Sequence, residues 1–300
     1  MKALFFFCTT DKRDPQSQGI LTELKRGNDT RSRNGAGLMK ESWDTLINRA
    51  RELASERSET AELLKFYAEL LCAQKEIYEQ LRGRKDWLPS GDLAADLSVI
   101  RSTLPILLKV VRTSGPAPLA EEARHLEPAT ETEISEILLE YWREPSDLHF
   151  FAKALLQPYA RWLAEAHATP IDRDLEWRED RCPFCAGKPQ LALFYAEEPS
   201  SEAGNRSLLC STCLTVWPFK RVLCANCGEE RPAKLAYFHT PEYDHARIEA
   251  CETCKHYIKG IDLTKLGYAA PLVDEVASAS LDLWARERGW KKIELNLVGL

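Results

Sequence analysis

Eight of the ten cysteines in this chain fall into four C-x-x-C pairs in its second half. The pairs are Cys182/Cys185, Cys210/Cys213, Cys224/Cys227 and Cys251/Cys254. A zinc or iron ion bound tetrahedrally by thiolates needs four sulfur atoms at about 2.3 Å, and each C-x-x-C turn supplies two of them. A quadruple array of this kind therefore predicts two four-sulfur metal sites.

The distances between the pairs along the chain indicate which pairs share an ion. Twenty-four residues separate Cys185 from Cys210 and 23 separate Cys227 from Cys251, whereas 10 separate the two middle pairs. The flanking sequences repeat as well, because CPFCAGKPQLALFY and RSLLCSTC are matched by CANCGEERPAKLAYF and RIEACETC. We expect one metal within each repeat, bound by Cys182, Cys185, Cys210 and Cys213 in the first and by Cys224, Cys227, Cys251 and Cys254 in the second. Spacing alone leaves an interleaved arrangement open.

Disulfides are the alternative use of these cysteines, and they need an oxidising compartment. The apolar segment 3–8 is too short for the core of a signal peptide or for a membrane span, and charged residues follow it directly. We therefore expect no export, no membrane insertion and metal-bound thiolates. Cys8 and Cys72 have no partner motif, and Cys72 is expected to be a buried thiol within a helix.

The composition is that of an ordinary globular protein, with 44% hydrophobic and 29% charged residues, and 300 residues suggest about two domains. The formal net charge of −6 argues against a nucleic-acid partner, because binding to phosphates needs clustered lysine and arginine. No G-x-x-x-x-G-K or G-x-G-x-x-G run indicates a nucleotide.

The hydrophobic pattern predicts an α+β protein with a helical first half. Apolar residues recur at helical spacing from Met39 to His167, which predicts an all-α bundle over 39–167. Polar residues 1–38 are expected to form a flexible leader, and the charged segment 168–181 a linker. Two tandem rubredoxin-like or zinc-ribbon units follow over 182–223 and 224–266, and a C-terminal helix from Pro271 to about Arg288 lies within 267–300.

Two polar side chains invite a functional interpretation. His256 lies two residues past Cys254, where it could hydrogen-bond a thiolate, although a solvent-facing histidine on a strand is the simpler alternative. Gln74 falls on the apolar stripe of its helix, so we expect it to lock two helices together rather than to form part of a binding site. Four-cysteine sites are closed to substrate, and no catalytic grouping is apparent, so we expect no enzymatic activity.

Taken together, these motifs resemble the formate dehydrogenase accessory proteins of the FdhE family. The resemblance covers about residues 39–300, and the cysteine array is its most specific part. Helical segments RARELA at 49–54 and LLKFYAELLCAQ at 63–74, and the terminal LDLWARERGWKK, are also similar to the family. Ala186 departs mildly from it, because the family often has glycine there. Besides the eight cysteines, the matching residues are Trp217, Arg221, Tyr237, Tyr257 and Lys259.

The resemblance implies a cytoplasmic, non-catalytic helper in the biogenesis of formate dehydrogenase. Such proteins bind the molybdenum- or tungsten-containing catalytic subunit, and their sites resemble rubredoxin knuckles. It implies two iron or zinc ions, each held by four cysteines. A rubredoxin-like iron redox protein and a nucleic-acid-binding zinc-ribbon protein are the alternatives. The five matching residues other than cysteine become candidates for partner binding, with packing of the ribbons as their other role.

Overall fold

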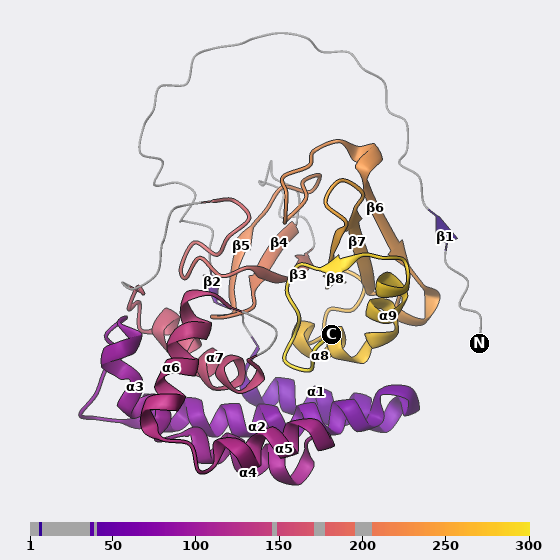
Figure 1. The fold of residues 1–300 in the computed structure, drawn as a ribbon. Coiled ribbons are helices and arrows are strands. Elements are labelled where there is room, and N and C mark those ends of the chain that lie inside the picture. The colour runs from indigo at the N-terminus through magenta and orange to yellow at the C-terminus, as the bar shows by residue number, and fades with distance from the viewer. Residues whose placement is uncertain (1–5, 8–36, 39–40, 146–148, 171–177, 196–205) are drawn as a thin grey trace, which may run out of the picture.

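The computed structural model describes residues 6–7, 37–38, 41–145, 149–170, 178–195 and 206–300. A layer of helices lies against one side of a twisted sheet; the first of two C-terminal helices lies between them, and the second packs against the sheet (Figure 1). The predicted α+β architecture is thereby confirmed, with a helical N-terminal region followed by two cysteine-bearing ribbons. Among the described residues, no helix is both long enough and apolar enough to span a bilayer.

Local signals in the sequence account for where the helices begin. Ser42 caps α1 by accepting a hydrogen bond from the Thr45 amide, and Thr130 forms a capping box with Glu133 at the start of α6. Helix α7 is buried on almost every side and is the central helix of the bundle. The helices of this region are α1 (Trp43–Glu56), α2 (Ala61–Gly83), α3 (Leu93–Arg101), α4 (Leu104–Ser114), α5 (Ala117–Leu126), α6 (Glu131–Arg143) and α7 (Phe150–Glu165).

Each repeat of the sequence folds into a three-stranded antiparallel meander. The first comprises β3 (Pro189–Phe194), β4 (Arg206–Cys210) and β5 (Thr215–Pro218), and the second β6 (Leu235–His239), β7 (Ala246–Cys251) and β8 (His256–Asp262). Strand β8 pairs in parallel with β3, so the two meanders share one sheet. Strand β9 (Lys291–Lys292) pairs with β8.

Most of the predicted leader lies outside the described residues, as does Cys8. Its two described segments, β1 (Phe6–Phe7) and β2 (Gly37–Leu38), pair with β6 and β5 at the two edges of the sheet. The predicted linker lies partly outside the described residues as well, so the domain boundaries remain a prediction. Ion pairs nevertheless connect the regions on either side of this linker. Arg49 of α1 bonds Asp274 at 2.9 Å, and Lys153 of α7 bonds Glu294 at 3.0 Å.

The helix predicted over 271–288 is divided into α8 (Pro271–Ala277) and α9 (Ala279–Glu287). Lys259 lies at this break, where its ammonium donates to the carbonyl oxygens of Glu275 and Ser278, at 2.7 and 3.0 Å. Leu283 of the second half is 52% exposed.

Candidate metal centres and the groove beside them

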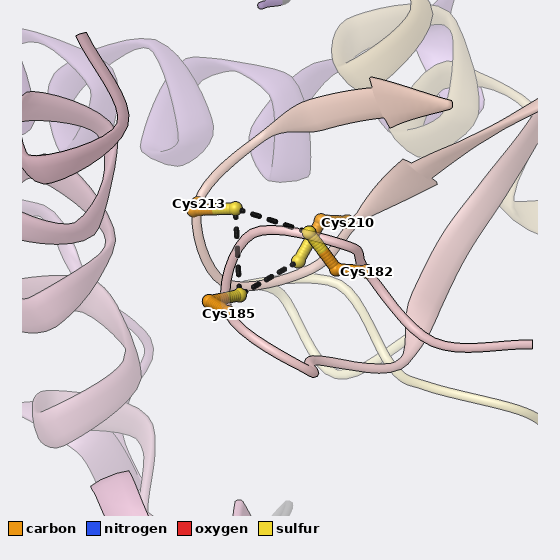
Figure 2. Close-up of side chains that lie close together, drawn as sticks. All are labelled: Cys182, Cys185, Cys210 and Cys213. Atoms are coloured by element: carbon orange, nitrogen blue, oxygen red, sulfur yellow. Dashed lines mark hydrogen bonds between the residues drawn. The ribbon is translucent and has the colours of Figure 1, made fainter. Parts of the chain in front are cut away.

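The first repeat brings four sulfur atoms together in the protein interior (Figure 2). The sulfurs of Cys182 and Cys213 lie 3.6 Å apart, and that of Cys185 lies 3.5 Å from Cys210 and 3.4 Å from Cys213. All four cysteines are buried. Four sulfurs placed tetrahedrally at about 2.3 Å from an ion are roughly 3.8 Å from one another, so the group has nearly the required size.

The second repeat forms an equivalent group at the protein surface. Its sulfurs are 3.8 Å apart between Cys224 and Cys254, and 3.8 Å apart between Cys227 and Cys251. Cys224 and Cys251 are buried, whereas Cys254 is half-buried and Cys227 is exposed. The cysteines thus group within each repeat as the spacing predicted, and an interleaved arrangement is not found.

The backbone of all four C-x-x-C turns has the conformation of a metal-binding knuckle. The residue after the second cysteine is left-handed in each, with φ values of 56° at Ala186, 59° at Leu214, 71° at Gly228 and 57° at Lys255. Amide groups inside the turns point at sulfur, as the Thr212 amide does toward Cys210 at 3.3 Å and the Asn226 amide toward Cys224 at 3.4 Å. Three non-glycine residues adopting this costly conformation at the same position indicate that the knuckle geometry is required.

Gly187 is the residue that lets the chain pass the first group. A Cβ atom at this position would lie 2.9 Å from the sulfur of Cys210 and 3.2 Å from that of Cys185. The second repeat has Glu229 at the corresponding place, and both residues accept the amide of the first cysteine of their repeat, at 2.9 Å. The first group is therefore more tightly enclosed by its own backbone than the second.

Electrostatics in the two groups favour a bound cation. Burial raises the pKa of Cys182 and Cys213 well above its usual range, because each thiolate would be a buried charge. At Cys254 burial acts in the same direction, but hydrogen bonds from the Asn226 side chain and the His256 backbone lower the pKa to about 7. A divalent cation would stabilise all four thiolates at once, which is the chemistry that either zinc or iron supplies.

A buried amide chain connects the helical region to the first group. Gln74 of α2 donates to the carbonyl oxygen of Ala154 at 3.0 Å and to the side-chain oxygen of Gln157 at 3.1 Å, both on α7. Gln157 in turn donates to the carbonyl oxygen of Ser211, between Cys210 and Cys213, at 2.9 Å. The predicted lock at Gln74 is confirmed. Gln157 was missed, although a glutamine within an otherwise apolar stretch of helix was the signal for it.

Two of the five residues proposed for partner binding lie in the interior, which favours packing of the ribbons, their alternative role. Tyr257 and Lys259 are fully buried. The Tyr257 hydroxyl donates to Asp282 at 2.9 Å, and the Lys259 ammonium forms an ion pair with the same carboxylate. Lys292 and Glu275 complete this buried cluster of charges. Carboxylates on α8 and α9 neutralise the lysines, which is why lysine is tolerated inside this sheet.

The other three residues lie closer to the surface. Trp217 is 5% exposed and its indole donates to the carbonyl oxygen of Glu179 at 3.1 Å, so packing is its main role. Arg221 is exposed and Tyr237 is half-buried, and both line a groove of about 390 Å³ that also touches Cys224 and Cys251. His256 lines it too, but its ring nitrogen lies 2.7 Å from the carbonyl oxygen of Cys254 rather than against a thiolate.

Comparison with known proteins gives a consistent result. A family model described as the C-terminal domain of FdhE matches residues 222–298. A protein FdhE homolog of Aquifex aeolicus is 37% identical over 196 residues, which are 64% of this chain and 68% of the relative. Protein FdhE of Escherichia coli is 26% identical over 279 residues, covering 86% of this chain and 88% of the relative.

One solved structure has the same fold. The crystal structure of the FdhE protein from Pseudomonas aeruginosa superposes with a TM-score of 0.63 and 21% sequence identity. The match covers 88% of this chain and 98% of that chain. It extends the similarity in fold over the helical region as well as the cysteine-bearing sheet.

Proposed function

We propose that this chain, which belongs to the FdhE family, is a non-catalytic accessory protein for the maturation of formate dehydrogenase. In this proposal it works in the cytoplasm and binds the molybdenum- or tungsten-containing catalytic subunit of that enzyme. Family membership supports the maturation role, because the relatives and the family model that match different parts of this chain are all named FdhE or FdhE homolog. The structure of the two cysteine groups supports a binding role rather than a catalytic one.

The closed form of both cysteine groups is the observation that carries this proposal. In each group, the four sulfur atoms lie within 4.8 Å of one another. A metal with four protein ligands has no free coordination position for a substrate or an activated water. The eight cysteines, the most distinctive residues of the chain, are therefore suited to stabilising its fold.

We propose that each group binds one zinc or iron ion. Cys182, Cys185, Cys210 and Cys213 would hold the first, and Cys224, Cys227, Cys251 and Cys254 the second. When bound, zinc supplies a rigid cross-link between the two knuckles of a repeat, and iron supplies in addition a one-electron couple. The surrounding chain contributes amide–sulfur hydrogen bonds and buries the first group.

The exposure of Cys227 favours a second candidate function, a rubredoxin-like electron carrier. A sulfur ligand at the surface gives a partner close access to the metal, which electron transfer requires and a purely structural site does not. Metal analysis of the purified protein and its visible absorption distinguish the two candidates. Colourless protein containing zinc excludes the carrier function, whereas iron that cycles between oxidation states supports it.

Deletion of the gene in its native host tests the proposed function. We expect formate dehydrogenase activity to be lost on deletion and restored by the wild-type chain, while the purified chain itself does not oxidise formate. A double variant, Cys182→Ser with Cys224→Ser, removes one proposed ligand from each cysteine group. We expect it to restore little formate dehydrogenase activity. Undiminished formate dehydrogenase activity in the deletion strain would overturn the proposal, and so would formate oxidation by the purified chain.

A further inference from the structure

The groove beside the second cysteine group is formed by one face of the second meander. Tyr237, Glu249 and Ile258 are direct cross-strand neighbours on β6, β7 and β8, and all three line the groove. Side chains on the opposite face are covered by helices, as the Phe238 ring is by Trp284 of α9 at 4.8 Å. The groove is therefore the uncovered face of this part of the sheet, and much of its lining is aliphatic: Val222, Leu223, Leu235, Ile258 and Ile293.

Arginines outnumber carboxylates among the side chains of the groove. Three arginines and one glutamate line it, beside Cys224 and Cys251 of a four-thiolate group that would carry a charge of −2 with a divalent ion bound. Arg206 and Arg247 both bond the carboxylate of Glu249, at 2.7 and 2.8 Å. Arg221 is exposed, and within the described part of the chain no carboxylate lies at ion-pair distance from it. Arg221 lines the groove, and a guanidinium can bind a carboxylate through two charge-assisted hydrogen bonds.

The loop that presents Arg221 is held in place by buried hydrogen bonds. Arg206 is 4% exposed, and its Nη1 donates to the carbonyl oxygens of Lys220 and Leu223, both at 2.9 Å. These two residues flank Arg221 and Val222, and the Val222 side chain is 48% exposed. A charged and an apolar contact are therefore fixed side by side at the rim of the groove, before any partner binds.

A second, smaller hollow continues the groove on the other side of the arginines. It measures about 170 Å³ and shares Arg221 and Arg247 with the first. Phe194 and Tyr195 of the first ribbon also line it, as do Asp262 and Thr264. The two hollows together give a path across the join between the meanders, with Arg221 at its middle, which suits an extended chain better than a compact molecule.

We propose that this path binds an extended, acidic segment of the partner protein, with a carboxylate on Arg221 and an apolar side chain against Val222. The proposal rests on the proposed function, since the segment would belong to the formate dehydrogenase catalytic subunit. Arg221 and Val222 lie next to each other at the rim, which favours an acidic residue beside an apolar one in the bound segment. The aliphatic lining favours a peptide over a bare anion.

Overlapping twelve-residue peptides covering the catalytic subunit provide the test, with binding to the intact metal-loaded chain measured by fluorescence anisotropy. The bound peptides should carry Asp or Glu beside an apolar residue. Arg221→Glu is expected to weaken their binding by about tenfold or more, because it removes a charge-assisted hydrogen bond. Lys220→Glu makes the same charge change on the neighbouring exposed residue outside the groove, and it should change binding by less than about threefold.

Three results would overturn the groove proposal. These are absence of peptide binding to the wild type, binding that Arg221→Glu and Lys220→Glu weaken equally, and binding unaffected by replacing the acidic residues of the peptide with amides. Capture of the intact catalytic subunit separates this proposal from the proposed function. If wild type and Arg221→Glu capture it equally, the groove is wrong while the accessory function stands. If neither captures it, the proposed partner itself is wrong.

Discussion

Gln157 on α7 donates a hydrogen bond to the main-chain oxygen of Ser211 at 2.9 Å, inside the knuckle between Cys210 and Cys213. Because Gln74 bonds the same side chain from α2, the helical region and the first cysteine group are connected by consecutive buried hydrogen bonds. Such bonds are costly to break when the partners stay buried. Folding of the helices and formation of the first metal site are therefore expected to be coupled.

Gln157→Leu tests this coupling. The change keeps the side-chain volume but removes one hydrogen bond of the buried Gln74 amide and the side-chain donor to the Ser211 carbonyl, so we expect a loss of about 1–3 kcal/mol in the free energy of unfolding. The first cysteine group of this variant should also lose its metal ion to a chelator faster than that of the wild type. Gln80→Leu replaces an exposed glutamine on α2 and is expected to change the unfolding free energy by less than about 0.5 kcal/mol. Denaturant unfolding of both variants, followed by circular dichroism, checks this; equal stability would contradict the coupling.

The two metal sites should release their ions at different rates. Cys227 is exposed, whereas every cysteine of the first group is buried, so a chelator in solution reaches the second site first. We expect two kinetic phases of metal release, each corresponding to one ion. Cys251→Ser should remove the fast phase and Cys182→Ser the slow one, each with about half of the bound metal. Loss of both ions from either single variant would indicate sites that do not fold independently.

Gly187→Ala is expected to impair the first metal site selectively. The added Cβ would lie 2.9 Å from one ligand sulfur, and the ligand cannot move away without losing its place in the tetrahedron. Gly228→Ala is the matched control: its Cβ would meet nothing within 4 Å, and its φ of 71° costs about 1 kcal/mol in an alanine. Elemental analysis should find about one ion in the first variant and two in the second. Two ions in both would mean that the site has more room than the structure indicates.

Asp282 should make stability depend on pH in the acid range. Burial tends to raise its pKa, but the ammonium groups of Lys259 and Lys292 outweigh this and lower it from 3.8 to about 2. The folded state therefore binds a proton less readily than the unfolded state. The resulting stabilisation, on the order of 2 kcal/mol, is present above about pH 4 and is lost as the pH falls toward 2.

Asp282→Asn is the variant that isolates this contribution. We expect it to cost about 3–5 kcal/mol near pH 7, because it leaves the buried Lys259 without a carboxylate partner and Lys292 with only Glu275, and the difference from wild type should shrink toward pH 2. Asp244→Asn, in an exposed ion pair with Lys265, should cost less than about 1 kcal/mol. Comparing variants at each pH removes the common effect of acid on the metal sites. A difference that stays constant between pH 6 and pH 2.5 would contradict the assignment.

Short-range patterns in the sequence predicted much of this molecule. Each C-x-x-C turn determines its own geometry within a few residues, and the repeated spacing sufficed to group the cysteines correctly. Gln74 was identified because a polar residue interrupted an apolar stripe. These features depend on residues that are close together in sequence or that recur at a fixed interval.

Contacts between residues that are far apart in the sequence could not be predicted from such patterns. Lys259 and Tyr257 have the sequence character of surface residues, and their burial depends on Asp282 and Glu275 of separate helices. The contact of Lys259 with the break at Ser278 likewise joins a strand to a separate helical segment. The parallel pairing of β3 with β8 and the arginines converging on Glu249 also join residues far apart in the chain. No local pattern specifies such contacts.

Affinity purification of the tagged chain from cells growing with formate tests the central claim most directly. Mass spectrometry would quantify the formate dehydrogenase catalytic subunit recovered with the wild-type chain and with Cys182→Ser/Cys224→Ser as the control. The account predicts strong enrichment of that subunit with the metal-loaded wild type and little with the control. Absence of the subunit from wild-type chain that carries both metal ions would contradict it.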